Sequence, residues 1–189
     1  MDRMSHRFAS PGLTLIELLI ALVVLAVTVT LVSPGMQQMV AGSRLRAESS
    51  RLLDALNLAR SEAILRNLPV SLCPSAMALS GEATCGGEFA GGWIVFANRN
   101  RDAVVDLDTD EVIRVFEALG EGYTLTNLAG TSSIDGLITY LPDGSSRRNL
   151  SLLLCPPWGV AVEPWRVVLN NVGRARVARG DGQCPRQSA

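Results

Sequence analysis

Glu17 has the most specific chemistry in this chain, because it is the single charged residue in an apolar run of membrane length. The run covers residues 13–33, and its other side chains are aliphatic, Ala, Thr or Ser. As a helix with a rise of about 1.5 Å per residue, it would span roughly 30 Å, the thickness of a bilayer's hydrocarbon core. A carboxylate in lipid is unfavourable unless it is paired. We therefore expect Glu17 to meet a cation.

Gly12 marks the junction between this run and a short polar leader. Residues 1–12 contain Arg3, His6 and Arg7, and the apolar helix is predicted to begin at once with Leu13. A secretory signal peptide would instead have its small-residue cleavage site at the far end of the apolar run. The arginines predict that the N-terminus stays in the cytoplasm.

The string GLTLIE at residues 12–17, after a basic leader, resembles the class III signal of type IV prepilins and type II secretion pseudopilins. The resemblance implies that a prepilin peptidase cuts after Gly12 and methylates Leu13. It also implies that Glu17 meets the amino terminus of a neighbouring subunit during assembly. The family usually has Phe where Leu13 stands, which exchanges one apolar residue for another. The alternative is an ordinary single-pass anchor whose Glu17 reaches the membrane interface.

Four cysteines all follow the apolar run. In an exported domain this even number predicts two disulfides, for which three pairings are possible. We favour the pairs that are neighbours in the sequence, because the second would fasten the C-terminal segment to a strand. These pairs are Cys73 with Cys85 and Cys155 with Cys184. No CxxC motif is present and the single histidine lies in the leader, so the sequence favours neither a Cys/His metal site nor a cofactor.

An enzyme is not expected. After residue 12 the chain has no histidine for Ser/His/Asp or Cys/His catalysis, and no Gly-rich phosphate loop follows a predicted strand. The acidic string at 98–111 suggests a calcium loop, but it lacks the glycine that an EF-type loop needs at its sixth position. We interpret it as a solvated turn, with calcium binding as the alternative.

Charge is divided unevenly along the chain. Residues 82–143 contain 11 acidic residues and three arginines, whereas residues 144–189 contain seven arginines and two acidic residues. In a strand, Arg174 and Arg176 would share one face, and Arg179 lies just beyond. Aligned guanidinium groups can bind successive phosphates, which suggests DNA binding without sequence preference. The alternative is that they form ion pairs with the acidic segment of the same or an adjacent subunit.

The elements that must position these residues are a long helix and a β-rich region. Leu45, Leu52, Leu56, Ala59 and Ala63 recur at helical spacing, which predicts an amphipathic helix as far as about residue 66. Pro34 and Gly35 are expected to kink or locally melt it. Runs of β-type residues between turn signals then predict antiparallel strands. They cover 69–73, 92–98, 111–119, 136–142, 150–155, 165–170 and 173–178.

These strings together resemble the GspH/FimT family of minor pilins and pseudopilins. The expected fold is α+β and pilin-like, with a long N-terminal helix packed on an antiparallel β-sheet head. The expected divisions are a leader at 1–12, a transmembrane and polymerisation helix at 13–33, its amphipathic continuation at 34–68 and a periplasmic head at 69–189.

The resemblance implies a minor pilin of a type IV pilus, held first in the bacterial inner membrane and then incorporated at or near the tip of the fibre. Its partners would be other pilin subunits, the prepilin peptidase and the assembly platform of the inner membrane. Two alternatives remain open. One is a minor pseudopilin of a type II secretion system, and the other is a DNA-binding pilin for natural transformation, a role associated with some FimT-like pilins.

Overall fold

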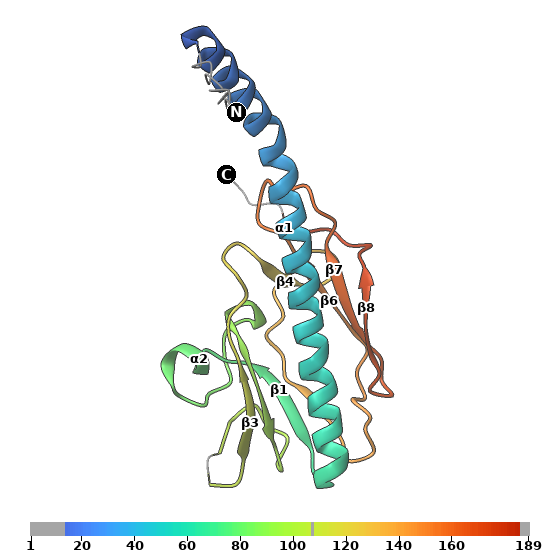
Figure 1. Ribbon diagram of the computed structural model, residues 1–189. Coiled ribbons are helices and arrows are strands. Elements are labelled where there is room, and N and C mark those ends of the chain that lie inside the picture. Colours follow the sequence, from blue (N-terminus) through green and yellow to red (C-terminus); the bar gives the residue numbers. More distant parts are fainter. Residues whose placement is uncertain (1–13, 107, 186–189) are drawn as a thin grey trace, which may run out of the picture. The chain divides into compact units, whose positions relative to one another are not determined.

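The computed structural model describes residues 14–106 and 108–185. The chain divides into two compact units, Met1–Gln37 and Gln38–Ala189. The helix α1, Leu15–Arg66, contributes to both units, and all the strands belong to the second (Figure 1).

From Thr14 onward, the first unit consists of the N-terminal part of α1. The helix begins after Thr14, whose hydroxyl accepts a hydrogen bond from the backbone N–H of Glu17 at 3.3 Å, as a helix-capping residue does. It continues through Pro34 and Gly35, so the expected local melting is wrong. One proline removes a single N–H donor, and apolar helices accommodate such residues by small local adjustments.

In the second unit, α1 is amphipathic, as its leucine spacing predicts. Each of its buried residues has another three, four or seven positions away, so they form one stripe. They include Ala41, Leu45, Leu52, Ala55, Leu56, Ala59 and Ala63. The helix ends at Arg66, as predicted, and Asn67 follows in the left-handed conformation with φ 53°.

In the described part of the chain, eight strands form two antiparallel four-stranded sheets. The first sheet has the order β3-β2-β1-β5, and the second has the order β4-β6-β7-β8. The strands are β1 Val70–Pro74, β2 Trp93–Ala97, β3 Glu111–Phe116, β4 Thr124–Thr126, β5 Ile138–Tyr140, β6 Leu150–Cys155, β7 Trp165–Leu169 and β8 Ala175–Arg179. All seven predicted strands are present, and β4 was missed. Two short helices, α2 Met77–Ser80 and the 3-10 turn Phe89–Gly91, were also not predicted.

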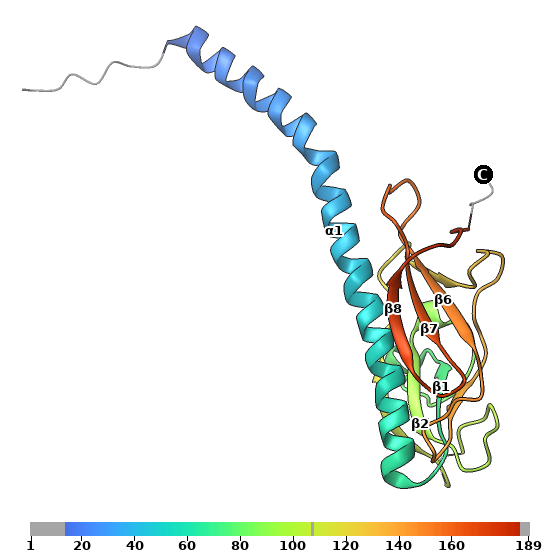
Figure 2. The same ribbon diagram turned by 90° about the vertical axis from the view of Figure 1, so that its right-hand side faces the viewer.

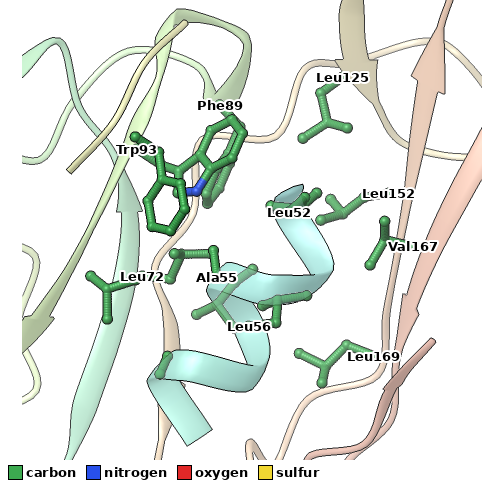
Figure 3. Packing of buried hydrophobic residues seen from close by; sticks show 14 of the residues in the cluster. Leu52, Ala55, Leu56, Leu72, Phe89, Trp93, Leu125, Leu152, Val167 and Leu169 are labelled. Atoms are coloured by element: carbon green, nitrogen blue, oxygen red, sulfur yellow. The ribbon is translucent and has the colours of Figure 1, made fainter. Parts of the chain in front are cut away.

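The core lies where the stripe of α1 meets the inner faces of both sheets. In Figure 3, Leu52 and Leu56 point into a space bordered on one side by Leu72 and Trp93 and on the other by Leu152 and Val167. All six residues are at most 2% exposed. The head part of α1 therefore joins two sheets that would otherwise present separate apolar faces to water.

Candidate functional site

Glu17 lies in the first turn of α1, at the position where the positive end of the helix dipole favours an acidic side chain. Its side chain is exposed. Among residues 14–106 and 108–185 it forms no ion pair, so the carboxylate is available to a cation from outside the described chain. The predicted processing residues Gly12 and Leu13 lie outside the described residues.

Thr14 is a site residue that the sequence analysis missed. Its hydroxyl accepts the N–H of Glu17 and its carbonyl accepts the N–H of Leu18 at 3.1 Å, which fixes the start of the helix. The signal was available in the sequence, because Thr followed three residues later by Glu is the pattern of a capping box. Thr14 thus positions the backbone from which the Glu17 carboxylate projects.

The apolar helix that carries Glu17 is exposed along its described side chains from Leu15 to Thr30. Leu15 is 78% exposed and Leu25 is 59% exposed. By length and composition the helix can cross a membrane. An exposed apolar surface of this length requires lipid or other apolar helices around it.

Cys73 and Cys85 form the first disulfide, with their Cα atoms 5.6 Å apart. Cys73 lies in β1 on the face of the first sheet that points away from α1, together with buried Ile94 and Phe96. Cys85 belongs to the segment that contains α2. The bond therefore fastens this segment over the outer face of the first sheet, and it is the pairing favoured from the sequence.

Cys155 and Cys184 form the second disulfide, with their Cα atoms 5.7 Å apart. Cys155 ends β6, and the segment containing Cys184 crosses the outer face of the second sheet. There the N–H of Gln183 donates to the carbonyl of Leu128 at 3.0 Å, and a Cβ on Gly182 would lie 2.7 Å from Leu153. This disulfide fastens the C-terminal segment to a strand, as the favoured pairing predicts.

The three arginines proposed for phosphate binding do not share one face. Arg174 and Arg176 are exposed and two residues apart, so they project on the same side of the β7–β8 hairpin. Arg179 has the opposite parity, and its guanidinium lies 5.5 Å from the ring centre of Trp165. Arg179 therefore does not extend the face that Arg174 and Arg176 share, and its part in phosphate binding stays a prediction.

The turn before β8 holds Arg174 in place. The Asn170 side chain accepts the backbone N–H of Arg174 at 2.8 Å, and Gly173 has φ +80°. A Cβ on Gly173 would collide with the carbonyl of Gly144, so only glycine fits there. Within the described part of the head, neither Arg174 nor Arg176 has an acidic partner. The expected ion pairs with the acidic segment of the same subunit are not formed among these residues.

The acidic string at 98–111 uses its polar groups to order its own backbone. The buried Asn98 amide donates to Ser71 Oγ at 3.0 Å and to the carbonyl of Asp102 at 2.8 Å. The Asp110 carboxylate accepts the N–H groups of Arg99 at 3.4 Å and Asp106 at 3.1 Å. Apart from residue 107, which is not described, no three ligand-type side chains here are grouped to hold a metal ion.

Comparisons with known proteins agree with this geometry. A family model described as "Type II transport protein GspH" matches residues 48–173, and one described as "Prokaryotic N-terminal methylation motif" matches residues 7–33. A comparison with curated protein sequences gave no significant match.

Among solved structures, the type IV minor pilin FimU of Pseudomonas aeruginosa is similar in two crystal forms. The first has 13% sequence identity and a TM-score of 0.54, covering 74% of this chain and 95% of FimU. The second has 13% identity and a TM-score of 0.51, covering 72% and 98%. The minor pseudopilin EpsH of the type 2 secretion system of Vibrio cholerae has 16% identity and a TM-score of 0.49, covering 72% of this chain and 97% of EpsH.

The FimU likeness concerns the fold alone, because the sequence identity is low. It shows that the long helix and the antiparallel sheets form a pilin-like α+β fold. The family follows from the sequence match, which extends over more than half of the chain, from the middle of α1 into the β7–β8 hairpin. The chain belongs to the GspH family, the family of minor pilins and pseudopilins.

Proposed function

We propose that this protein is a minor pilin of a type IV pilus. In this proposal the peptidase removes residues 1–12 and methylates Leu13, and the chain stays in the inner membrane with its head in the periplasm. The assembly platform then moves it into the fibre, at or near the tip. The observation that carries the proposal is the position of Glu17, an exposed carboxylate that forms no ion pair with the described residues and lies in the first turn of an exposed apolar helix.

The reason is the unfavourable free energy of that carboxylate in an apolar surrounding. Lipid can solvate the leucine side chains of α1, but it offers no partner to a charge. In a fibre, the apolar helices of other subunits would surround α1, and the new amino terminus of one of them would supply the cation. A charge in this place therefore favours assembly with other pilin subunits over a passive anchor.

Mass spectrometry of the membrane-bound protein tests the processing step. The proposal predicts a mature chain that begins at Leu13 with a methylated amine. A bulky replacement of Gly12 should block cleavage, because the peptidase must approach this backbone closely. A chain that begins at Met1, or one cut after the apolar run, would refute it.

The alternative is a minor pseudopilin of a type II secretion system, because both systems share the signal, the anchor and the fold. A deletion strain separates them when surface pili and secreted proteins are measured side by side. Loss of pili with normal secretion supports the proposal, whereas loss of secretion with normal pili supports the alternative.

A second candidate function is DNA capture, favoured by the two exposed arginines of the β7–β8 hairpin. The full-length protein in detergent should then shift duplex DNA of any sequence at low salt. Replacing Arg174 and Arg176 together with Gln should weaken the shift and lower the salt slope of the remaining binding by about 2. The matched control replaces the exposed Arg99 and Arg101. Equal shifts for all three proteins, or none for any, would exclude this function.

A further inference from the structure

Arg166 lies on the same face of the second sheet as Arg174 and Arg176. In the register of β7 and β8, Arg176 is opposite Val168, and Arg166 is opposite Ala178. Residues directly opposite each other share a face of an antiparallel sheet, and so do residues two apart on one strand. In Figure 2, β7 and β8 lie side by side, and β8 forms the edge of the sheet. The three arginines therefore belong to one face of the hairpin.

The opposite face of this hairpin belongs to the core. Val167 and Leu169 are buried, and Ala175 and Val177 pack against the same cluster. Because side chains alternate along a strand, the face that carries the arginines points away from the core. The hairpin thus presents its arginines on the outer side of the second sheet.

The three arginines follow the hairpin at regular steps. Residues two apart on a strand are separated by about 7 Å, which is the step from Arg174 to Arg176. The next step reaches the level of Ala178, where the charged residue is Arg166 on the neighbouring strand. Neighbouring phosphates along one nucleic-acid strand have a similar separation. A row of guanidinium groups with this spacing can bind successive phosphates, each of them bidentately.

Arg166 differs from the other two arginines because it has an acidic neighbour, Asp181, in the segment that follows β8. Arg166 Nη2 lies 3.6 Å from the Asp181 carboxylate, which is long for a charged hydrogen bond. The Asp181 side chain is 91% exposed, and that of Arg166 is 23% exposed. An ion pair with so exposed a partner is weak, because water and salt screen it. Another anion can therefore displace the Asp181 carboxylate.

A second acidic residue, Glu163, lies at the same end of the hairpin and provides a comparison. The backbone N–H of Gly180 donates to the carbonyl of Pro164 at 3.0 Å, so the residues that flank this pair, Glu163 and Asp181, are near each other. Both are exposed. Glu163 forms no ion pair with the described residues, whereas Asp181 pairs with Arg166. The two carboxylates thus differ in their contact with the arginine.

We propose that Arg166 is a third phosphate-binding arginine of the hairpin, and that Asp181 occupies it until a nucleic acid displaces the carboxylate. A phosphate can bind the guanidinium bidentately, whereas the carboxylate meets it through one long contact. This inference rests on the second candidate function, DNA capture by Arg174 and Arg176. It adds one residue to that site and a competing carboxylate that weakens binding.

The phosphate contact is tested by shift assays with the full-length protein in detergent and duplex DNA, repeated over a range of salt concentrations. Arg166→Gln should lower the salt slope by about 1, because one phosphate contact is lost. Arg166→Lys keeps the charge and should keep the slope. Near-ultraviolet circular dichroism of each variant checks that the head is folded. An unchanged salt slope in folded Arg166→Gln would overturn the role of Arg166.

The competition is tested by Asp181→Asn, matched to Glu163→Gln. Both variants remove one negative charge from the same end of the hairpin, and both residues are exposed, so the fold is kept. Asp181→Asn should tighten DNA binding by up to about fivefold, the range that an exposed ion pair gives. Glu163→Gln should tighten it less. In combination with Arg166→Gln, the gain from Asp181→Asn should fall to that of Glu163→Gln.

Two outcomes would overturn the competition. The first is an equal gain for Asp181→Asn and Glu163→Gln, which would assign the effect to net charge alone. The second is a gain for Asp181→Asn that persists in full without Arg166. A wild-type protein that shifts no DNA at low salt would refute DNA capture itself, and the inference with it. That failure is distinguishable, because it is seen before any variant is compared.

Discussion

The two parts of α1 have the same secondary structure and opposite surroundings. From Leu15 to Thr30 the described side chains are exposed, although most are aliphatic. In the head part, from Gln38 to Arg66, leucines and alanines of one stripe are almost fully buried, and Leu45 and Leu56 are 0% exposed. Because the backbone hydrogen bonds are the same in both parts, the difference lies in their partners. The head part finds its partners within the chain, whereas the N-terminal part must find them in lipid or in other subunits.

The largest effect on folding should come from the buried stripe. We expect Leu56→Ala to lower the free energy of unfolding of the head by about 2 to 5 kcal/mol, because it leaves a cavity between two sheets. The matched control is Leu22→Ala in the apolar run, where Leu22 is 53% exposed. Urea unfolding of the full chain in detergent, followed by near-ultraviolet circular dichroism, measures the free energy of unfolding of the head in both variants. Equal destabilisation by the two variants would contradict the division of α1 into two parts.

The disulfides should contribute the next largest effect. They close loops with sequence separations of 12 and 29, so the chain-entropy model gives about 3 kcal/mol for Cys73–Cys85 and about 3.5 kcal/mol for Cys155–Cys184. Paired replacement by Ser should therefore destabilise the head in both cases, and slightly more for the second. Non-reducing peptide mapping must find these two links in the wild type. Crossed links or free thiols would refute the arrangement of the two outer faces.

A small pH effect should come from the end of the head helix. Arg66 donates to Glu111 at 2.6 Å, and this hydrogen bond and the guanidinium charge lower the pKa of the Glu111 carboxyl. A lowered folded-state pKa contributes stability above the unfolded-state pKa of about 4.3, and this is lost as pH falls through the folded value. Glu111→Gln should thus flatten the acid side of the stability profile slightly. Because Glu111 is exposed, salt at roughly 0.5 M should screen this ion pair and flatten the acid side of the stability profile in the same way.

An unchanged acid profile in Glu111→Gln would show that this ion pair does not contribute to folding. The variant Arg66→Gln provides the reciprocal check. It removes the same pair, and also the contact of Arg66 with Glu62 at 2.6 Å. It should therefore lower stability at neutral pH at least as much as Glu111→Gln.

The sequence predicted those elements whose signal is local. The end of α1 at Arg66 followed from the leucine spacing, and β2 and β6 followed from continuous runs of β-type residues. The strand β4 has three residues, which is too short for any periodicity to show. The separation into two sheets depends on contacts between distant residues, such as the pairing of β1 with β5, and no local pattern reports it.

The candidate site was predicted to a similar extent. Glu17 stood out because one charge in an apolar run has few explanations, and the cysteine pairs followed from sequence proximity. Arg174 and Arg176 were placed on one face by strand alternation, and Arg179 has the opposite parity in β8.

We propose that Glu17 acts between subunits and not within the folded head. Immunoblots of sheared fibres and of membranes from cells that express wild type, Glu17→Gln or Glu17→Ala test it most directly. We predict that both variants are cleaved after Gly12, remain in the membrane and keep the stability of the head, yet are strongly depleted from fibres. Glutamine keeps the size of the side chain and removes its charge, so this variant separates the effect of charge from the effect of size. Normal amounts of Glu17→Gln in the fibre would contradict the account.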